Sequence, residues 1–190
     1  MSTTSIMIVG VGGQGTLLTS RILGRVAQDS GYDVKVSEVH GMSQRGGSVV
    51  TYVKYGESVF SPIIDKGCAD IILAFEELEA YRYLEYLKPG GKMICNTQNI
   101  NPMPVILGMG TYPQNISDKI KEKGIDFFGL NALRLAQEAG NAKAANVALI
   151  GVLAKNTAIP KSEWLDAINA TVPSKLLDVN IRAFEAGYGI

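Results

Sequence analysis

Cysteine and histidine are scarce in this sequence of 190 residues, which contains two cysteines and one histidine. Cys68 and Cys95 lie far apart and cannot provide the paired spacing of a zinc site or an iron–sulfur cluster, so we expect no metal site on this chain. We expect both cysteines to be small buried residues in the reduced form. His40 would be the only base for Ser-His-Asp chemistry, and neither a Gly-x-Ser-x-Gly turn nor a P-loop is present. Because the standard catalytic sets are missing, we predict no catalytic residue.

An excess of charge of either sign is also missing, because 18 lysine and arginine residues balance 18 aspartate and glutamate residues. We therefore expect no large basic footprint for nucleic acid. No apolar run approaches the roughly 20 residues that cross a bilayer. The first residues, Met-Ser-Thr-Thr, lead directly into a strand pattern without the features of a signal peptide. These observations predict a cytoplasmic protein that binds neither nucleic acid nor membrane, with residues 1–190 forming one α/β domain.

What the sequence does contain is a glycine-rich turn between a strand pattern and a helix pattern. Residues 6–9 form an apolar run that is typical of a buried parallel strand, and residues 16–28 carry an apolar stripe at helical spacing. Gly10-x-Gly12-x-x-Gly15 lies between them, in the position of a Rossmann phosphate loop. Glycine has no Cβ atom, so an anion can approach the backbone N–H groups of such a turn closely. These groups and the positive end of the helix dipole favour a phosphate, or a partner's carboxylate, there. The alternative is that the glycines only let strand and helix pack closely. The candidate anion-binding or partner-contacting residues are Gly10, Gly12, Gly13, Gln14 and Gly15.

The remaining pattern alternates strands and helices, which predicts a three-layer, Rossmann-like α/β sheet with helices on both faces. The expected strands are residues 33–39, 48–55, 59–64, 69–75, 92–96 and 125–128. The expected helices are residues 76–87, 118–123 (capped by Ser117), 131–138, 142–156, 161–169 and 174–186, which make the C-terminal third helical. The strands expected at residues 48–55 and 59–64 follow one another without a helix, as a hairpin through Gly56 and Glu57, so we expect a mixed strand order.

We expect several other polar residues to have structural roles instead of functional ones. Glu76, Glu77 and Glu79 are expected to form a charged first helical turn, which the helix dipole favours. Asn146 and Asn180 lie in otherwise apolar helical patterns, so we expect them to be buried and to find hydrogen-bond partners.

A polar, glycine-rich stretch follows the second expected strand. Glu38 lies near the position of a ribose-binding acid in NAD sites. His40 can titrate near neutral pH, and Arg45 offers a planar fork for a carboxylate or a phosphate. Because the carboxyl ends of strands in an α/β sheet lie on the ligand side, we favour a functional loop over a solvated surface loop. The candidate residues for an interface or substrate-access loop are Glu38, His40, Ser43, Gln44, Arg45, Gly46 and Gly47.

Together these motifs resemble the gamma-type subunits of 2-oxoacid:ferredoxin oxidoreductases. The resemblance rests on the glycine motif at residues 10–15 in tandem with Glu-Val-His-Gly-Met-Ser-Gln-Arg-Gly-Gly at residues 38–47. It continues through Asn146 and Gly151 to the Asn-x-x-Ala-Phe-x-x-Gly pattern at residues 180–187, and it covers nearly the whole chain. The Val-His-Gly-Met-Ser-Gln sequence before Arg-Gly-Gly favours the indolepyruvate type over the pyruvate and 2-oxoglutarate types.

The resemblance implies a division of labour between subunits. A large partner subunit would carry thiamine diphosphate and iron–sulfur clusters, and the complex would oxidatively decarboxylate a 2-oxoacid, form an acyl-CoA and reduce ferredoxin. This chain would bind no cofactor of its own, would be inactive in isolation, and would belong to a domain type associated with access of the co-substrate coenzyme A. The residues leave two other functions open. One is a stand-alone NAD(P)-binding oxidoreductase, which the glycine motif and Glu38 favour and the 40–47 stretch opposes; the other is a nucleotide-binding regulatory module without catalysis.

Overall fold

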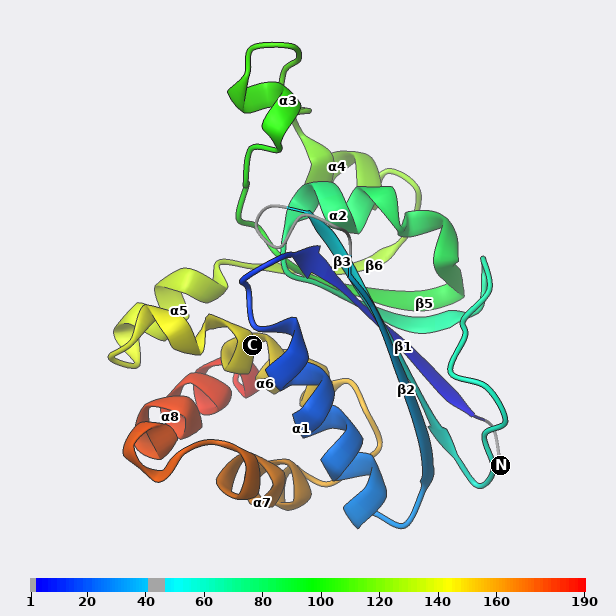
Figure 1. Cartoon of the computed structure of the whole chain (residues 1–190), viewed down its shortest axis with the longest axis vertical. Helices are drawn as coiled ribbons and strands as arrows, with labels where there is room; N and C mark the ends of the chain where they lie inside the picture. The colour runs from blue at the N-terminus through cyan, green and yellow to red at the C-terminus, as the bar shows by residue number, and fades with distance from the viewer. Residues whose placement is uncertain (1–2, 41–46) are drawn as a thin grey trace.

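The fold is built on a six-stranded mixed sheet, as the computed structural model of the chain shows (Figure 1). The structure describes residues 3–40 and 47–190, without the side chain of His40. The strands are β1 (Thr4–Val11), β2 (Asp33–His40), β3 (Ser48–Gly56), β4 (Ala69–Ala74), β5 (Leu87–Asn96) and β6 (Asp126–Leu130). Their order is β2-β3-β1-β4-β5-β6; β1, β4, β5 and β6 run parallel, and β3 is antiparallel to both of its neighbours. The expected α/β sheet of mixed strand order is therefore confirmed.

Helices cover both faces of this sheet, as expected. One face carries α1 (Thr16–Asp29), α5 (Ala132–Glu138), α6 (Ala145–Lys155), α7 (Lys161–Thr171) and α8 (Leu177–Tyr188). The other face carries α2 (Glu77–Arg82) and α4 (Ile116–Lys121). The short helix α3 (Met103–Ile106) projects away from both layers (Figure 1). None of the helices in the described part of the chain is both long and apolar enough to cross a membrane.

The apolar run of β1 is continuous because helices cover both faces of this strand. Ile6, Met7, Ile8 and Val9 have no exposed surface. Ile6 and Ile8 face the core under α1 and α6, while Met7 and Val9 face the core under α2 and α4. A strand buried on both faces needs apolar residues at every position rather than at alternate ones.

The helices α6 and α8 cross with their backbones in contact. A Cβ atom at Gly187 would lie 1.9 Å from the carbonyl oxygen of Ala148, and one at Gly151 would lie 2.2 Å from the carbonyl oxygen of Phe184. Asn180, buried in α8 as expected, satisfies its amide by donating to the carbonyl oxygen four residues earlier in the chain, at 2.7 Å. The sequence patterns around residues 146–151 and 180–187 therefore meet in one helix pair.

The expected strand at residues 59–64 is wrong, because this segment is irregular. Pro62 lacks the N–H donor that a paired strand needs, and Phe60 is 95% exposed. The side chain of Val59 is buried and its N–H donates to Oδ2 of Asp33 at 2.8 Å. A loop fixed to the sheet by buried side chains thus mimics the alternation of a strand.

The expected helix at residues 76–87 is also too long. α2 ends at Arg82, a 3₁₀ turn follows, and β5 begins at Leu87, which pairs with Ala69 of β4. Gly90 has a φ of 75° and lies inside β5 instead of beyond a helix. Strand pairing therefore takes over residues whose spacing fits a helix.

Two smaller expectations are corrected between β5 and β6. The short helix α3 lies at Met103–Ile106, where no helix was expected. The next helix begins at Ile116 with Asn115 as its N-cap residue, so Ser117 is not the cap; its hydroxyl hydrogen-bonds a carboxylate oxygen of Glu77 instead.

The two cysteines differ in environment. Cys95 in β5 is buried as expected, but Cys68 is exposed because it lies in the turn before β4. Burial, with the nearby negative charges of Glu77 and Glu76, raises the pKa of the Cys95 thiol well above its ordinary value. We therefore predict that a disulfide reagent labels one thiol per native chain at pH 8. Cys68→Ser should remove this fast reaction, and denaturant should expose the second thiol; two equally fast native thiols would contradict the prediction.

Candidate functional site

The glycine-rich turn lies at the carboxyl end of β1, where α1 begins. Gly13 and Gly15 have φ angles of 98° and 85°, in the left-handed region that favours glycine. Gly15 is the N-cap residue of α1, and no side chain caps this helix. The first turn of α1 therefore directs backbone N–H donors and the positive end of its dipole toward this edge of the sheet.

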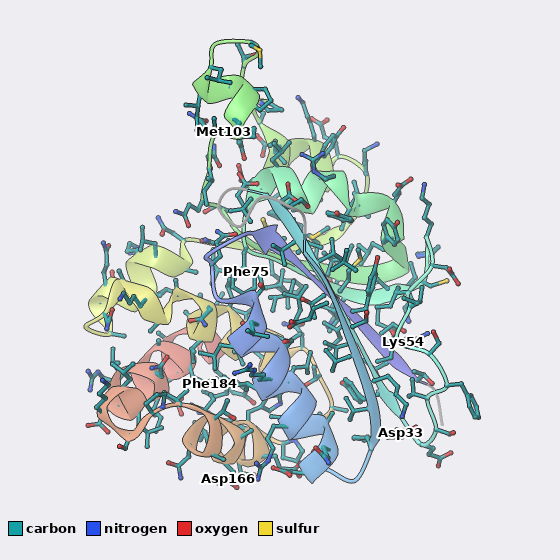
Figure 2. All side chains as sticks on the ribbon, in the orientation of Figure 1. Asp33, Lys54, Phe75, Met103, Asp166 and Phe184 are labelled. Carbon is teal, nitrogen blue, oxygen red and sulfur yellow. The ribbon has the colours of Figure 1, made fainter. Side chains whose placement is uncertain are left out.

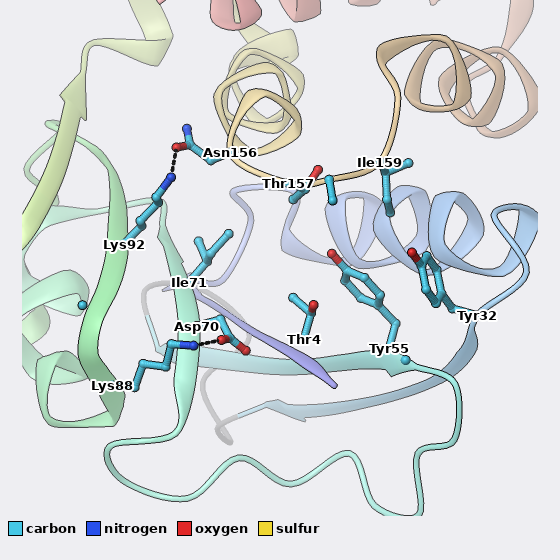
Figure 3. A pocket seen from close by; sticks show the side chains of 13 residues that line it. Thr4, Tyr32, Tyr55, Asp70, Ile71, Lys88, Lys92, Asn156, Thr157 and Ile159 are labelled. Carbon is cyan, nitrogen blue, oxygen red and sulfur yellow. Dashed lines mark hydrogen bonds and ion pairs between the residues drawn. The ribbon is translucent and has the colours of Figure 1, made fainter. Parts of the chain in front are cut away.

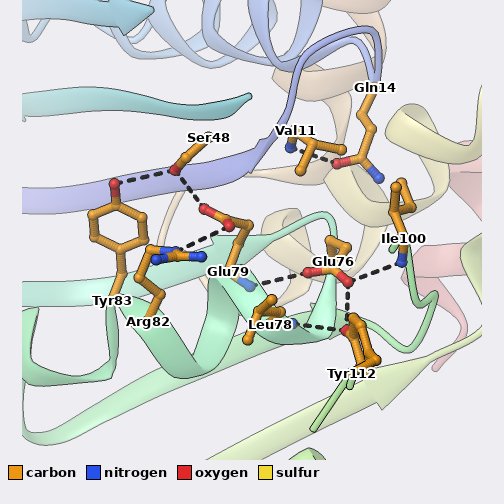
Figure 4. A network of polar contacts seen from close by, with 10 residues as sticks. All are labelled: Val11, Gln14, Ser48, Glu76, Leu78, Glu79, Arg82, Tyr83, Ile100 and Tyr112. Carbon is orange, nitrogen blue, oxygen red and sulfur yellow. Dashed lines mark hydrogen bonds and ion pairs between the residues drawn. The ribbon is translucent and has the colours of Figure 1, made fainter. Parts of the chain in front are cut away.

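Gln14 ties the turn to the end of the neighbouring strand β4. Its Oε1 accepts a hydrogen bond from the N–H of Val11 at 2.9 Å (Figure 4), and its Nε2 donates to the carbonyl oxygen of Phe75 at 2.9 Å. A Cβ atom at Gly10 would lie 2.9 Å from both Gln14 Oε1 and Phe75 Cβ. Gly10 and Gln14 thus hold the turn closed, and the Gln14 amide is engaged within the chain.

Asn146 brings α6 against the same turn. Its side chain is buried, as expected, and its Nδ2 lies 3.5 Å from the carbonyl oxygen of Gly15. A Cβ atom at Gly15 would lie 2.7 Å from Asn146 Nδ2. The carbonyl oxygen of Gly15 also accepts from the N–H of Thr19 at 3.2 Å. Gly15 is therefore needed both for its backbone angle and for the close approach of α6.

A cavity of about 460 Å³ opens beside the turn. Its lining includes residues 13–15, Asn96 at the end of β5, Gln98 just beyond it, and Lys143 and Asn146 around the start of α6. Lys143 is exposed, and its ammonium forms no ion pair with any residue that the structure describes. A cation, several amides and a helix N-terminus without a side-chain cap suit an anionic group.

Asn96 and Lys143 were not among the residues expected at the site. Oδ1 of Asn96 accepts from the N–H of Ala132 at 3.0 Å, and Nδ2 donates to the carbonyl oxygen of Phe75 at 3.2 Å. Asn96 ends a strand that was expected, so the rule that ligands lie at carboxyl ends of strands gives a signal for it. Lys143 lay in an expected helix, where a lysine carries no such signal.

The last residue of the polar stretch at residues 38–47 contacts the glycine turn. The carbonyl oxygen of Gly47 accepts from the N–H of Gly12 at 3.0 Å. Glu38 in β2 accepts from the hydroxyl of Ser20 in α1 at 2.7 Å. His40 ends β2 opposite Val49. Of the other candidates, Ser43, Gln44, Arg45 and Gly46 lie outside the described residues.

Two buried carboxylates, of Glu76 and Glu79, form hydrogen bonds between the elements next to this stretch. Glu76, expected in a charged first turn, is instead the buried N-cap of α2, where Oε2 accepts from the N–H of Glu79 at 3.0 Å. Oε1 accepts from the N–H of Ile100 at 3.0 Å and from the hydroxyl of Tyr112 at 2.5 Å (Figure 4). The buried carboxylate of Glu79 accepts from the hydroxyl of Ser48, the first residue of β3, at 2.5 Å. These bonds join β3, α2 and the chain beyond β5 at one edge of the sheet.

A second cavity, of about 580 Å³, lies by the amino ends of β1 and β4 (Figure 3). Its charged groups are engaged with neighbours: Lys88 pairs with Asp70, and Nζ of Lys92 donates to Oδ1 of Asn156 at 2.9 Å. It lies away from both sequence motifs. The cavity beside the glycine turn is lined by three residues of the glycine motif, and we take it as the candidate site. Within the described part of the chain, no group of three or more His, Cys, Asp and Glu side chains is placed to hold a metal ion.

Comparison with known proteins identifies relatives along almost the whole chain. The model of the family described as pyruvate ferredoxin/flavodoxin oxidoreductase matches residues 5–190. Indolepyruvate oxidoreductase subunit IorB of Thermococcus kodakarensis is 47% identical, over 98% of this chain and 95% of the relative. The same subunit of Pyrococcus horikoshii is 44% identical over the same shares. The crystal structure of the keto/oxoacid ferredoxin oxidoreductase gamma subunit from Geobacter sulfurreducens has a TM-score of 0.77 at 22% identity, covering 100% of this chain and 96% of that chain.

Proposed function

The chain belongs to the pyruvate ferredoxin/flavodoxin oxidoreductase family as a small subunit of a 2-oxoacid:ferredoxin oxidoreductase, and we propose from this premise that its complex acts on indolepyruvate or a related aryl pyruvate in the cytoplasm. The observation that carries the substrate class is the 47% identity to an indolepyruvate oxidoreductase subunit along 98% of the chain. The tandem of the glycine motif and the 38–47 stretch supports the same assignment.

The proposed complex divides binding and chemistry between subunits. The large subunit carries thiamine diphosphate and iron–sulfur clusters, which together supply the decarboxylation and the electron transfer. Cleavage of the bond between the carboxylate and the oxo carbon releases CO2, the acyl group forms a thioester with the sulfur of coenzyme A, and the two electrons of the oxidation pass to ferredoxin. The sequence supports this division because two cysteines cannot ligate a four-cysteine cluster on this chain alone.

The candidate cavity suits an anionic end of coenzyme A or a carboxylate of the large subunit. The N-terminus of α1, the ammonium of Lys143 and the amide of Asn146 supply donors around one space. Phosphate groups bind readily at helix N-termini, where backbone N–H groups and the helix dipole act together. Gly10, Gly12 and Gln14 would shape the turn instead of binding the anion. Gly12 and Gln14 already form hydrogen bonds within the chain, and Gly10 leaves no room for a side chain.

The stand-alone NAD(P)-binding oxidoreductase and the nucleotide-binding regulatory module are less well supported. Glu38 bonds to Ser20, and the N–H of Gly12 bonds to the carbonyl oxygen of Gly47, so groups that a dinucleotide needs are already in use. Calorimetry with NADH, NADPH and adenine nucleotides separates the alternatives. Low-micromolar binding of either reduced dinucleotide to the isolated chain would revive the oxidoreductase, and nucleotide binding without turnover would revive the module.

Assembly gives a direct test of the proposed function. The chain should co-purify at a fixed ratio with the large subunit that carries thiamine diphosphate and the iron–sulfur clusters, when the two are co-expressed anaerobically. Ferredoxin should be reduced by this complex and by neither subunit alone. Recovery of the large subunit without this chain, at every ratio of expression, would contradict the proposal.

We predict that Arg45 contacts the large subunit or coenzyme A. Arg45→Ala should weaken one of these interactions by at least about 2 kcal/mol, the cost of truncating a desolvated arginine at an interface. Arg45→Lys should also weaken it, because lysine keeps the charge but lacks the planar fork. The affinity for the large subunit, the KM for coenzyme A and the melting temperature of the isolated chain separate the possibilities. Unchanged affinity and unchanged KM in Arg45→Ala would contradict the prediction that Arg45 contacts the large subunit or coenzyme A.

A further inference from the structure

The segment around α3 exposes four large apolar side chains, while Val105 in the same segment packs against the core under α2 and α4. These four side chains lie within residues 103–109 and are mostly exposed: Met103 (55%), Ile106 (63%), Leu107 (62%) and Met109 (72%). The segment projects beyond the sheet and its covering helices (Figures 1 and 2). We propose that residues 103–109, here called the anchor segment, insert into an uncharged apolar recess of the large subunit. This inference rests on the proposed function.

The absence of charge around the anchor segment indicates a protein interface. No lysine, arginine, aspartate or glutamate occurs between Lys92 and Asp118. Interface cores are depleted of charged residues and enriched in methionine, whereas monomeric proteins keep contiguous exposed apolar patches small. Two methionines among the exposed residues let the surface adapt to the recess, because their side chains are unbranched and polarisable.

The anchor segment is held in place at both of its ends by one carboxylate. Oε1 of Glu76 accepts from the N–H of Ile100 before the segment and from the hydroxyl of Tyr112 after it. Burial, with the hydrogen bond to Glu76 and its charge, raises the pKa of the Tyr112 phenol well above its ordinary value, so the hydroxyl stays protonated and donating. A segment that is ordered before binding loses less conformational entropy on association.

The position of the anchor segment favours the large subunit over other occupants. Gln98 and Ile100, which lead into it, line the candidate cavity beside the glycine turn. A partner that covers this cavity therefore extends onto the anchor segment. A stable dimer buries about 800 Å² on each partner, which a segment of this length cannot provide alone to a second copy. A membrane surface is disfavoured because residues 93–117 contain no lysine or arginine to attract anionic lipids.

Single charges test the anchor segment in the full-length chain. Ile106→Glu and Met109→Glu should each weaken binding to the large subunit at least tenfold, measured by biolayer interferometry, because each places a charge in an apolar recess. Both should leave the melting temperature of the isolated chain unchanged, since the two side chains are exposed. Phe60→Glu is the matched control, because Phe60 is also an exposed large apolar residue and lies outside this segment. It should bind like the wild type.

The outcomes separate this inference from the proposed function. If the wild-type chain does not bind the large subunit, the proposed function itself fails. If the wild type binds and both charged variants bind equally well, only the role of the anchor segment is overturned. Sedimentation of the isolated chain over a range of concentrations provides a further arm. Self-association of the wild type that Ile106→Glu abolishes would assign the segment to a second copy and would also overturn the inference.

Discussion

Replacing Gly187 with alanine should lower the free energy of unfolding by at least about 4 kcal/mol, an effect in the exceptional range for a single substitution. The new Cβ atom would lie 1.9 Å from the oxygen and 2.8 Å from the carbon of the Ala148 carbonyl. Both are backbone atoms of α6, so no side-chain rotation relieves the overlap and the two helices must separate. Separation also exposes the buried side chains of Ala183 and Phe184, which pack in the same core. Gly151→Ala should act alike, because its Cβ atom would lie 2.2 Å from the carbonyl oxygen of Phe184.

Gly24→Ala is the matched control for this prediction. Gly24 is also a helical glycine, in α1, but the nearest atom to its Cβ position is a methyl group of Val36 at 3.7 Å. This substitution should be neutral or should stabilise the protein by up to about 1 kcal/mol, through the higher helix propensity of alanine. Chemical denaturation of the isolated chain measures all three variants. A Gly187→Ala protein as stable as Gly24→Ala would show that α6 and α8 do not cross as closely as described.

Replacing Glu76 with alanine should lower the free energy of unfolding by about 3–5 kcal/mol. Each buried donor that loses its acceptor destabilises the fold by about 1–3 kcal/mol. Its carboxylate accepts from the N–H groups of Ile100 and Glu79 and from the hydroxyl of Tyr112. The loss of the N-cap bond of α2 is part of this cost. Tyr112→Phe removes one of these bonds and should cost less. Both variants should also speed proteolysis between residues 97 and 112, because the carboxylate holds this segment to the fold.

Glu122→Ala controls for the loss of a carboxylate as such. Glu122 is exposed at the end of α4, so its replacement should change stability by no more than about 0.5 kcal/mol. Denaturation and limited proteolysis together test the assignment. Wild-type stability and wild-type cleavage in Glu76→Ala would mean that Glu76 does not secure this segment.

Local patterns in the sequence predict the first strand, the glycine turn after it and the two buried asparagines. The apolar run at residues 6–9 is buried on both faces, and the glycines that follow it are needed where φ is positive. Asn146 and Asn180 are buried, as their apolar surroundings indicate. Each of these predictions depends on side chains and backbone within one or two turns of the chain.

Contacts between distant residues account for the parts that the sequence does not predict. Val59 is buried because it closes a loop over the sheet, so the loop carries the same alternation of apolar residues as a strand. Glu76 looks like one acid of a charged helical turn, but its role as a buried clamp depends on Ile100 and Tyr112. Gly151 and Gly187 belong to recognisable patterns, yet only the helix crossing shows why alanine does not fit there.

Turnover by the assembled and the separated subunits tests the proposed division of labour. The rate of coenzyme A-dependent oxidation of indolepyruvate, with ferredoxin as acceptor, is compared for this chain alone, for the large subunit alone and for their mixture under anaerobic conditions. We expect no turnover by this chain alone, and we expect the activity of the large subunit to rise and saturate as this chain is added. Turnover by this chain alone, or an activity of the large subunit that is already complete without it, would show that the two subunits do not share the work in this way.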